Sequence, residues 1–343
     1  MILILSHNHI EEPTNNVIDW LRFKEAKFKR INGDDFILSK NFTLDLEKKT
    51  LENNVYETIY PDDVSIVWYR RWIKPLVRSV NFNGYIKNNF SVPEILLIES
   101  YETFLKNELT AYSNGIFSLF DNKEWIPNVQ STRGKLNKID VLFKAKKLGL
   151  QIPNTIITTS KEVLINFYKK NETLITKPIF EVLPMIYKKT SISMYTRLVE
   201  LSDINNFPDQ FSPSLFQKKI DKLFEIRVFI YKKKLFSMAI FSQNDDQTKV
   251  DFRNYNDQKP NRNVPFKLPK DISNKIFKLM ANLKLNTGSI DLMVSKENDY
   301  IFLEINPVGQ LGMVSLGGNY YLEKMIADDL IRIDNKYVRN KKN

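Results

Sequence analysis

The residues best suited to chemistry lie near the end of the chain, in the segment GSIDLMVSKENDYIFLEINP. Its pattern predicts a β-hairpin with residues 296–299 as the loop. Ser295 then pairs with Tyr300, and with the same register Asp291 faces Glu304 on the neighbouring strand. The hairpin therefore predicts that two acidic side chains lie opposite each other.

The oxygen-bearing side chains of this hairpin suit a hard cation. Because side chains alternate along a strand, Asp291, Glu304 and Asn306 share one face of the sheet. Carboxylates opposed on neighbouring strands lie about 5 Å apart and repel unless a cation neutralises them. Oxygen ligands of this kind suit Mg²⁺. We expect a magnesium site, and the alternative is a pair of solvated acids on a half-exposed hairpin. The opposite face is apolar and comprises Leu292, Val294, Ile301, Leu303 and Ile305.

Two basic residues occupy positions from which they could act on a phosphoryl group. Lys177 ends the strand pattern LITKPI, where Pro178 enforces extended geometry, so its side chain reaches either water or a phosphate. In FEIRVFIY the alternation leaves Glu225 and Arg227 together on the polar face. They form either a plain salt bridge or, beside an acidic metal site, a group that neutralises a transferring phosphoryl. The buried face of this strand comprises Ile226, Val228 and Ile230.

Further candidates are less distinctive. Lys138 lies in the first turn of a helix predicted over 135–148, where a lysine opposes the helix dipole and a phosphate would explain it. Arg253 and Arg262 lie in a polar loop, DFRNYNDQKPNRNVP, and either contact substrate or keep the surface soluble. No glycine-rich phosphate loop of the Walker or dinucleotide type occurs, so neither of those nucleotide folds is supported.

The elements that position these residues alternate between strands and helices. We expect an N-terminal α/β domain over 1–125, a central subdomain over 126–213 and a C-terminal subdomain over 214–343 that holds the metal site. In the last of these, SLFQKKI and FEIRVFIY lead through a basic turn into LFSMAIFSQ, a strong hairpin pattern. The fold class is α/β (α+β).

Composition narrows the chemistry. The 343 residues include no cysteine, which excludes disulfides, thiolate catalysis and cysteine zinc sites. Only two histidines occur, His7 and His9, so no histidine-rich metal site can form. Neither a signal pattern nor an apolar run long enough for a membrane is present, and we expect a cytoplasmic protein. The net charge of +11 favours anionic partners, which leaves nucleic acid binding as an alternative.

Taken in order, five segments resemble the ATP-grasp superfamily, and most closely the graspetide synthetases of the "grasp-with-spasm" type. They are VWYRRW, LNKIDVLFKAKKLGLQIPNT, LITKPI, LFQKKIDKLFEIRVF and the run from Ser289 to Gln310. The resemblance covers nearly the whole chain and implies a preATP domain, a central domain and a C-terminal ATP-grasp domain. In that fold ATP lies between two sheets.

The resemblance also implies roles for individual residues. Lys138 and Lys177 match phosphate-binding lysines, Glu225 matches the ribose-side acid, and Arg227 matches the arginine at the terminal phosphate, so that Lys177 and Arg227 are the catalytic pair. Asp291, Glu304 and Asn306 match the Mg²⁺ ligands, with Asn306 also close to the nucleotide. The hinge whose backbone reads adenine corresponds to Gln217, Lys218, Lys219 and Ile220. Lys218 departs from the family, which often has glutamate there.

The activity that the resemblance implies is an ATP-dependent carboxylate ligase acting on a ribosomal precursor peptide with a leader and a core. Such enzymes phosphorylate Asp or Glu side chains and close esters with Ser or Thr, or amides with Lys. Arg70 and Arg71 match a segment near the leader or substrate. The alternatives are a ligase that adds amino acids to a peptide or protein end, and a non-catalytic basic protein that binds nucleic acid. We expect no membrane and no nucleic acid partner, and a homodimer is a possible assembly.

Overall fold

The computed structural model describes residues 1–7, 11–36, 42–53, 58–72, 92–128, 136–179, 185–187, 190–192, 196–249, 252 and 256–342. The chain forms two compact units. The first comprises Met1–Arg133 with Leu322–Asn343, and the second comprises Gly134–Tyr321. The last helix, α10 (Leu322–Lys342), therefore packs within the first unit, although the sequence analysis assigned it to the C-terminal subdomain.

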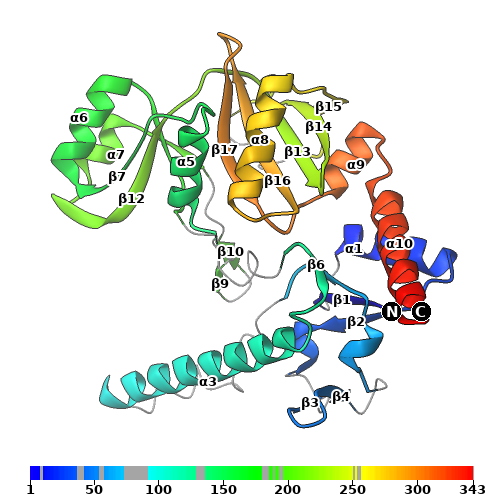
Figure 1. The fold of residues 1–343 in the computed structure, drawn as a ribbon. Coiled ribbons are helices and arrows are strands. Elements are labelled where there is room, and N and C mark those ends of the chain that lie inside the picture. The colour runs from blue at the N-terminus through cyan, green and yellow to red at the C-terminus, as the bar shows by residue number, and fades with distance from the viewer. Residues whose placement is uncertain are drawn as a thin grey trace. The chain divides into compact units, whose positions relative to one another are not determined.

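The first unit is built on a parallel sheet of four strands in the order β2-β1-β5-β6 (Figure 1). Its core joins Leu3 and Leu5 of the first strand to Ile116, near the end of the long helix α3, and to Phe120 just after that helix. Helices α1 and α10 pack against each other. The bounds are β1 (Ile2–Ser6), α1 (Glu12–Phe23), β2 (Phe28–Asn32), β3 (Phe42–Asp45), β4 (Thr50–Asn53), β5 (Ile66–Tyr69), α3 (Val92–Ser118) and β6 (Glu124–Ile126).

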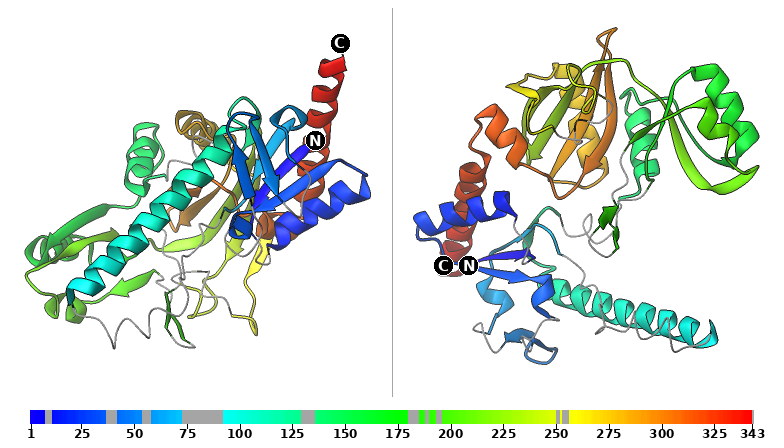
Figure 2. Two further views of the ribbon diagram at one scale, coloured as in Figure 1. Left: turned by 90° about the horizontal axis from the view of Figure 1, so that it is seen from below. Right: turned by 180° about the vertical axis from the view of Figure 1, so that it is seen from behind.

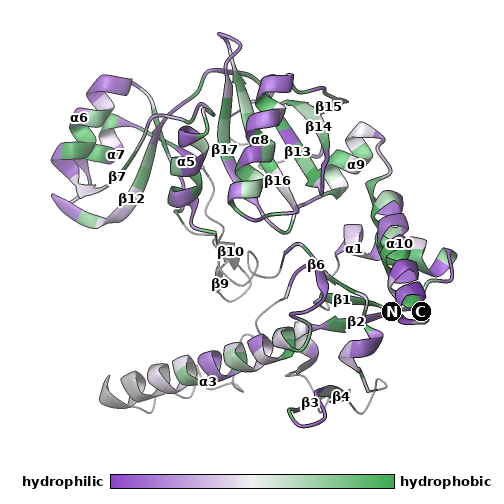
Figure 3. Cartoon of the chain, in the orientation of Figure 1, coloured by the Kyte–Doolittle hydropathy of each residue, from purple (hydrophilic) through white to green (hydrophobic). Residues whose placement is uncertain are grey.

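The second unit contains a five-stranded antiparallel sheet in the order β15-β14-β13-β16-β17. Its apolar face packs against α5 and α8; α8 lies in front of the strands in Figure 1, and the right panel of Figure 2 shows the sheet from behind. Both helices alternate between hydrophilic and hydrophobic residues (Figure 3), as expected of helices with one buried side. The bounds are α5 (Lys138–Lys147), β13 (Lys222–Tyr231), β14 (Lys234–Phe241), β15 (Arg262–Pro265), α8 (Lys270–Asn282), β16 (Thr287–Ser295), β17 (Tyr300–Asn306) and α9 (Gly312–Gly318).

A second sheet of the same unit has the order β11-β8-β12-β7. Leu174 and Phe216 on one of its faces pack with Leu164 of α6 and Ile204 of α7. Because side chains alternate, Ile175 and Gln217 point to the opposite face. The bounds are β7 (Thr155–Ser160), α6 (Lys161–Asn171), β8 (Leu174–Thr176), β9 (Met185–Tyr187), β10 (Thr190–Ile192), β11 (Arg197–Val199), α7 (Leu201–Asn205) and β12 (Gln210–Lys218).

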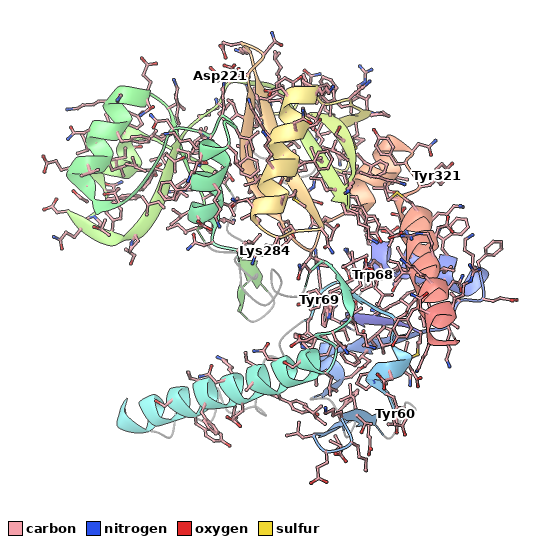
Figure 4. All side chains as sticks on the ribbon, in the orientation of Figure 1. Tyr60, Trp68, Tyr69, Asp221, Lys284 and Tyr321 are labelled. Atoms are coloured by element: carbon pink, nitrogen blue, oxygen red, sulfur yellow. The ribbon has the colours of Figure 1, made fainter. Side chains whose placement is uncertain are left out.

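A short link between β12 and β13 joins the two sheets. Asp221, labelled in Figure 4, lies in this link. The predicted hairpin of β13 and β14 is confirmed, with Tyr231 paired with Lys234 across a turn where Lys232 has a φ of 55°. The segment that precedes it, β12, belongs to the other sheet. The link therefore brings the ends of both sheets together.

Candidate functional site

Three charged side chains form a row across the polar face of the five-stranded sheet. Arg227 of β13 pairs with Asp291 of β16, which pairs in turn with Glu304 of β17. The predicted opposition of Asp291 and Glu304 is confirmed. The apolar partners of the same strands, Ile226, Val228, Ile290 and Leu292, lie in the core under α5 and α8. The sheet thus has one dry face and one charged face.

A β-bulge changes the hairpin beyond the acidic pair. From Leu292 onward the register shifts, so that Leu292 pairs with Phe302 and Val294 with Tyr300. The predicted Ser295–Tyr300 pair is therefore wrong. The extra residue of a bulge points its neighbours in new directions: Phe302 is fully buried in the core, whereas Leu303, expected there, lines the cleft described below.

Each carboxylate of the row has a cation beside it. Arg227 Nη1 lies 3.3 Å from Asp291 Oδ1, and Lys138 Nζ lies 3.3 Å from Glu304 Oε2. Lys138 reaches the row because Asn137 begins the helix α5 as its N-cap, with Oδ1 accepting from the backbone N of Ile139 at 2.9 Å. Lys138 and Arg227 therefore neutralise the two carboxylates at the position where a metal ion would bind.

The Arg227 side chain is buried, and not all of its N–H groups are hydrogen-bonded to described residues. Its Nη2 donates to Gln310 Oε1 at 2.8 Å. Its Nε has no hydrogen-bond partner within the part of the chain that the structure describes. Gln310 was missed by the sequence analysis because it follows the end of β17, where strand alternation no longer indicates direction.

A buried ion pair lies further along β13. Lys222 Nζ contacts Glu225 Oε1, which also accepts from Ser242 Oγ at 3.1 Å. Burial raises the pKa of the Glu225 carboxyl, the attraction of Lys222 opposes this, and the negative charge of Asp291 adds to it. Lys222 was also missed. Its odd spacing from Glu225 predicts opposite faces, but an irregularity in register between Lys222 and Phe224 brings both to one face.

The two sheets of the second unit enclose a cleft that is partly open to solvent. From the four-stranded sheet come Ile175 and Gln217, which are paired across β8 and β12, and Lys177 just after β8. The full lining comprises Pro153, Ile175, Lys177, Thr196, Gln217, Lys218, Lys219, Ile220, Lys222, Glu225, Lys249, Phe252, Asp291, Met293, Leu303 and Glu304.

The segment between the sheets offers backbone groups to this cleft. Lys218 N donates to Asn154 O and Lys219 N donates to Thr173 O, both at 2.9 Å. The carbonyl of Lys219 and the amide of Ile220 have no backbone partner among the described residues. Adjacent carbonyl and amide groups of this kind can recognise a flat ring with one donor and one acceptor.

Other predicted residues lie outside the cleft lining. Asn306 pairs with Ser289, and its Oδ1 accepts from Val308 N at 3.2 Å, so its oxygen already has a backbone partner. Arg262 is exposed on β15 with its guanidinium 5.7 Å from the ring centre of Phe241. Arg253 and His9 fall outside the described residues.

Arg70 and Arg71 belong to the first unit. Arg70 is buried, with Nη2 3.1 Å from Glu11 Oε1 and Nε donating to Thr14 Oγ1 at 3.1 Å. Burial acts to raise the pKa of Glu11, but Arg70, Thr14 and Arg71 outweigh it and lower that pKa. Arg70 is therefore paired with an acid inside its own unit, whereas the side chain of Arg71 is 46% exposed.

The acidic row suits a hard cation. Within the described ranges no group of three or more His, Asp or Glu side chains could hold a metal, so the row offers two carboxylates, with Asn306 two residue pairs further along the hairpin. Mg²⁺ binds in this way, through one or two carboxylates with water and phosphate oxygens. The residues therefore fit Mg²⁺ beside a nucleotide.

Of the described helices, none is both long and apolar enough to cross a membrane.

Comparisons with known proteins identify the fold. No protein-family model and no curated protein matches the chain. Among solved structures, the macrocyclase MdnC from Microcystis aeruginosa MRC, bound with precursor peptide MdnA, is 24% identical with a TM-score of 0.78, covering 96% of this chain and 99% of that one. A RiPP-associated ATP-grasp ligase from Chryseobacterium gregarium, in complex with ADP and a leader and core peptide, is 24% identical with a TM-score of 0.75, covering 96% of both chains. The ATP-grasp ligase PsnB, complexed with a precursor variant, Mg and ADP, is 15% identical with a TM-score of 0.74, covering 97% and 98%. The chain therefore has the ATP-grasp fold, as predicted.

Proposed function

We propose that this chain is an ATP-dependent ligase that activates Asp or Glu side chains of a ribosomal precursor peptide and closes them onto Ser, Thr or Lys side chains. Support comes from the ATP-grasp fold and from three similar structures that were solved with a precursor, or with a leader and core peptide. The observation that carries the proposal is the row of Arg227, Asp291 and Glu304, whose two carboxylates line a cleft together with Lys177.

Nucleotide recognition follows from the cleft walls. The carbonyl of Lys219 and the amide of Ile220 would bind the adenine edge, between apolar walls that include Ile175 and Met293. Glu225, at the buried end, would accept hydrogen bonds from the ribose hydroxyls. The hinge residues Gln217 and Lys218 line the same wall of the cleft. Graspetide synthetases often have glutamate at the position of Lys218, so Lys218 would contribute mainly through its backbone.

Phosphate binding would rearrange the ion pairs of the row. In the structure Lys138 and Arg227 each neutralise one carboxylate. Mg²⁺ held by Asp291, Glu304 and Asn306 would supply Lewis-acid neutralisation of the phosphate oxygens. Lys138 and Arg227 would then be available for phosphate oxygens, together with Lys177. The exchange keeps every buried charge paired, which matters because an unpaired buried charge is strongly unfavourable.

The chemistry then needs two displacements. An oxygen of the peptide carboxylate attacks the γ-phosphorus, the bond from that phosphorus to the bridging oxygen breaks, and ADP leaves. A hydroxyl or amine of the same peptide next attacks the activated carbonyl, loses its proton and expels phosphate. Arg227 would stabilise the charge on the transferring phosphoryl group, and holding both peptide groups together replaces a protein nucleophile.

The charge of the chain favours an acidic peptide. A net charge of +11 attracts a core rich in Asp and Glu and accelerates its association. The cytoplasm, which supplies ATP and Mg²⁺, is the proposed compartment. We also propose a homodimer, which analytical ultracentrifugation would test. The division into three domains over 1–125, 126–213 and 214–343 is a further proposal.

Mass spectrometry tests the proposal. The protein is incubated with ATP, Mg²⁺ and a candidate precursor peptide, sought among short reading frames beside its gene that contain Thr or Ser and Asp or Glu repeats. Loss of one water from the peptide per ring, with release of ADP, is the expected result. Gain of a residue mass would favour the ligase that adds amino acids, and salt-sensitive nucleic acid binding without ADP release would favour the non-catalytic alternative.

A further inference from the structure

The guanidinium of Arg227 is held at two points. Nη1 faces Asp291, at 3.3 Å from Oδ1 and 3.4 Å from Oδ2, and Nη2 donates to Gln310 Oε1 at 2.8 Å. The contact with Gln310 is the shorter one and is well within hydrogen-bonding distance, whereas the contacts with Asp291 are long for a charge-assisted bond. Arginine only donates, so the amide oxygen of Gln310, and not its nitrogen, must face Arg227.

The position of Gln310 depends on the segment after β17, which passes close to β13 and β16 at Gly309. Gly309 has a φ of +75°, and a Cβ at this position would lie 2.9 Å from Phe229 Cε2 and 3.4 Å from Gly288. Only glycine fits this conformation and this distance. Beyond it, Gln310 O accepts a hydrogen bond from Ser289 Oγ at 3.2 Å. The backbone of Gln310 is thus fixed to β16, while its side chain reaches Arg227 on β13.

The neutral amide has a specific consequence for charge. A carboxylate at this position would give Arg227 a second anionic partner and leave it neutralised. An amide oxygen orients the guanidinium but leaves its charge available to a phosphate. The orphaned Nε of Arg227, buried with no hydrogen-bond partner in the described residues, is consistent with an arginine that awaits an anionic ligand.

We propose that Gln310 is a positioning residue: it orients the guanidinium of Arg227 toward the transferring phosphoryl group without neutralising it. The proposal rests on the proposed function for the identity of that group. Misplacing a catalytic group by about 1 Å can lower the rate about a hundredfold, so loss of the Gln310 contact should reduce kcat more than substrate binding.

The kinetic test measures ADP release with the precursor peptide for Gln310→Leu, Gln310→Glu, Arg227→Lys and the double variant Arg227→Lys with Gln310→Leu. Gln310→Leu should lower kcat about tenfold or more with little change in KM for ATP. Gln310→Glu keeps the acceptor atom and should instead raise KM for ATP. In the Arg227→Lys background the Leu substitution should have almost no further effect, because the two residues act as one unit. The matched control is Gln151→Leu, which removes a contact of 3.1 Å to Asp299 in the hairpin loop before β17 and should behave as wild type.

A second readout does not need activity. In protein with ¹⁵N-labelled arginine, NMR reports rotation about the Nε–Cζ bond of Arg227, whose signals are assigned by their loss in Arg227→Lys. Slow rotation in the wild type that becomes fast in Gln310→Leu is the expected result. Equal rotation in both proteins, or a kcat for Gln310→Leu within about twofold of wild type, would overturn the proposal. Wild-type protein that releases no ADP would instead refute the proposed function, and the NMR comparison would still decide the role of Gln310.

Discussion

Replacing Lys222 by methionine isolates the buried ion pair at the ribose end of the cleft. The side chains of Lys222 and Glu225 are only 3% and 6% exposed, so the substitution leaves a carboxylate buried without its cation. Breaking a buried pair in this way costs about 3–5 kcal/mol, whereas an exposed pair contributes about 0–1 kcal/mol. Lys48→Met is the matched control, because the side chain of Lys48 is 68% exposed beside Asp45.

The loss of stability should depend on pH. Burial already raises the pKa of Glu225, and removing Lys222 raises it further. A carboxyl whose pKa is higher in the folded state keeps its proton there while the unfolded chain releases it, so stability falls as pH rises from the ordinary carboxyl pKa through the raised one. Urea unfolding followed by circular dichroism should show a larger deficit for Lys222→Met at neutral pH than at mildly acidic pH. Adding Glu225→Gln should recover most of it. An equal deficit at both pH values, or one below about 1 kcal/mol at neutral pH, would refute the reasoning.

Four further substitutions test the site and the strands that build it. Lys177→Met should weaken ATP binding, measured by calorimetry, about tenfold or more because a phosphate loses its cation, and unchanged affinity would remove the phosphate role. Phe302→Ala should lower the free energy of unfolding by about 3–5 kcal/mol and Leu303→Ala by much less, because the bulge puts only Phe302 in the core. Denaturant titrations measure both values, and a larger loss for Leu303→Ala would support a regular hairpin without the bulge. Gly309→Ala should lower thermal stability and ADP release together, since its Cβ would collide with Phe229; wild-type behaviour in both assays would contradict the close approach.

The part of the site that follows from strand alternation could be predicted from the sequence. Asp291 and Glu304 face each other as the hairpin pattern indicates, and Glu225 and Arg227 share the polar face opposite Ile226. Alternation fails wherever the strand is irregular. The bulge beyond Asp291 exchanges the positions of Phe302 and Leu303, since one extra residue reverses the side chains of β17 between the bulge and the hairpin loop.

Residues outside regular strands carried no such signal. Lys222 joins Glu225 only through an irregularity in β13, and Gln310 reaches Arg227 only because the chain turns back at Gly309. The burial of the polar face of β13 could not be predicted from the sequence either. Arg227 and Glu225 are 6% and 5% exposed, although alternation alone marks their face of the sheet as polar. Contacts between segments far apart in the chain cannot be deduced from the period of one strand.

Calorimetry of ATP binding with and without Mg²⁺ tests most directly whether the acidic row holds a cation against nucleotide phosphates. It compares the wild type with the double variant Asp291→Asn with Glu304→Gln, and Gln151→Leu serves as the control. We expect Mg²⁺ to strengthen ATP binding by the wild type and the control and to have little effect on the double variant, whose circular dichroism should match that of the wild type. Equal strengthening by Mg²⁺ in all three proteins would contradict the assignment of the metal to Asp291 and Glu304.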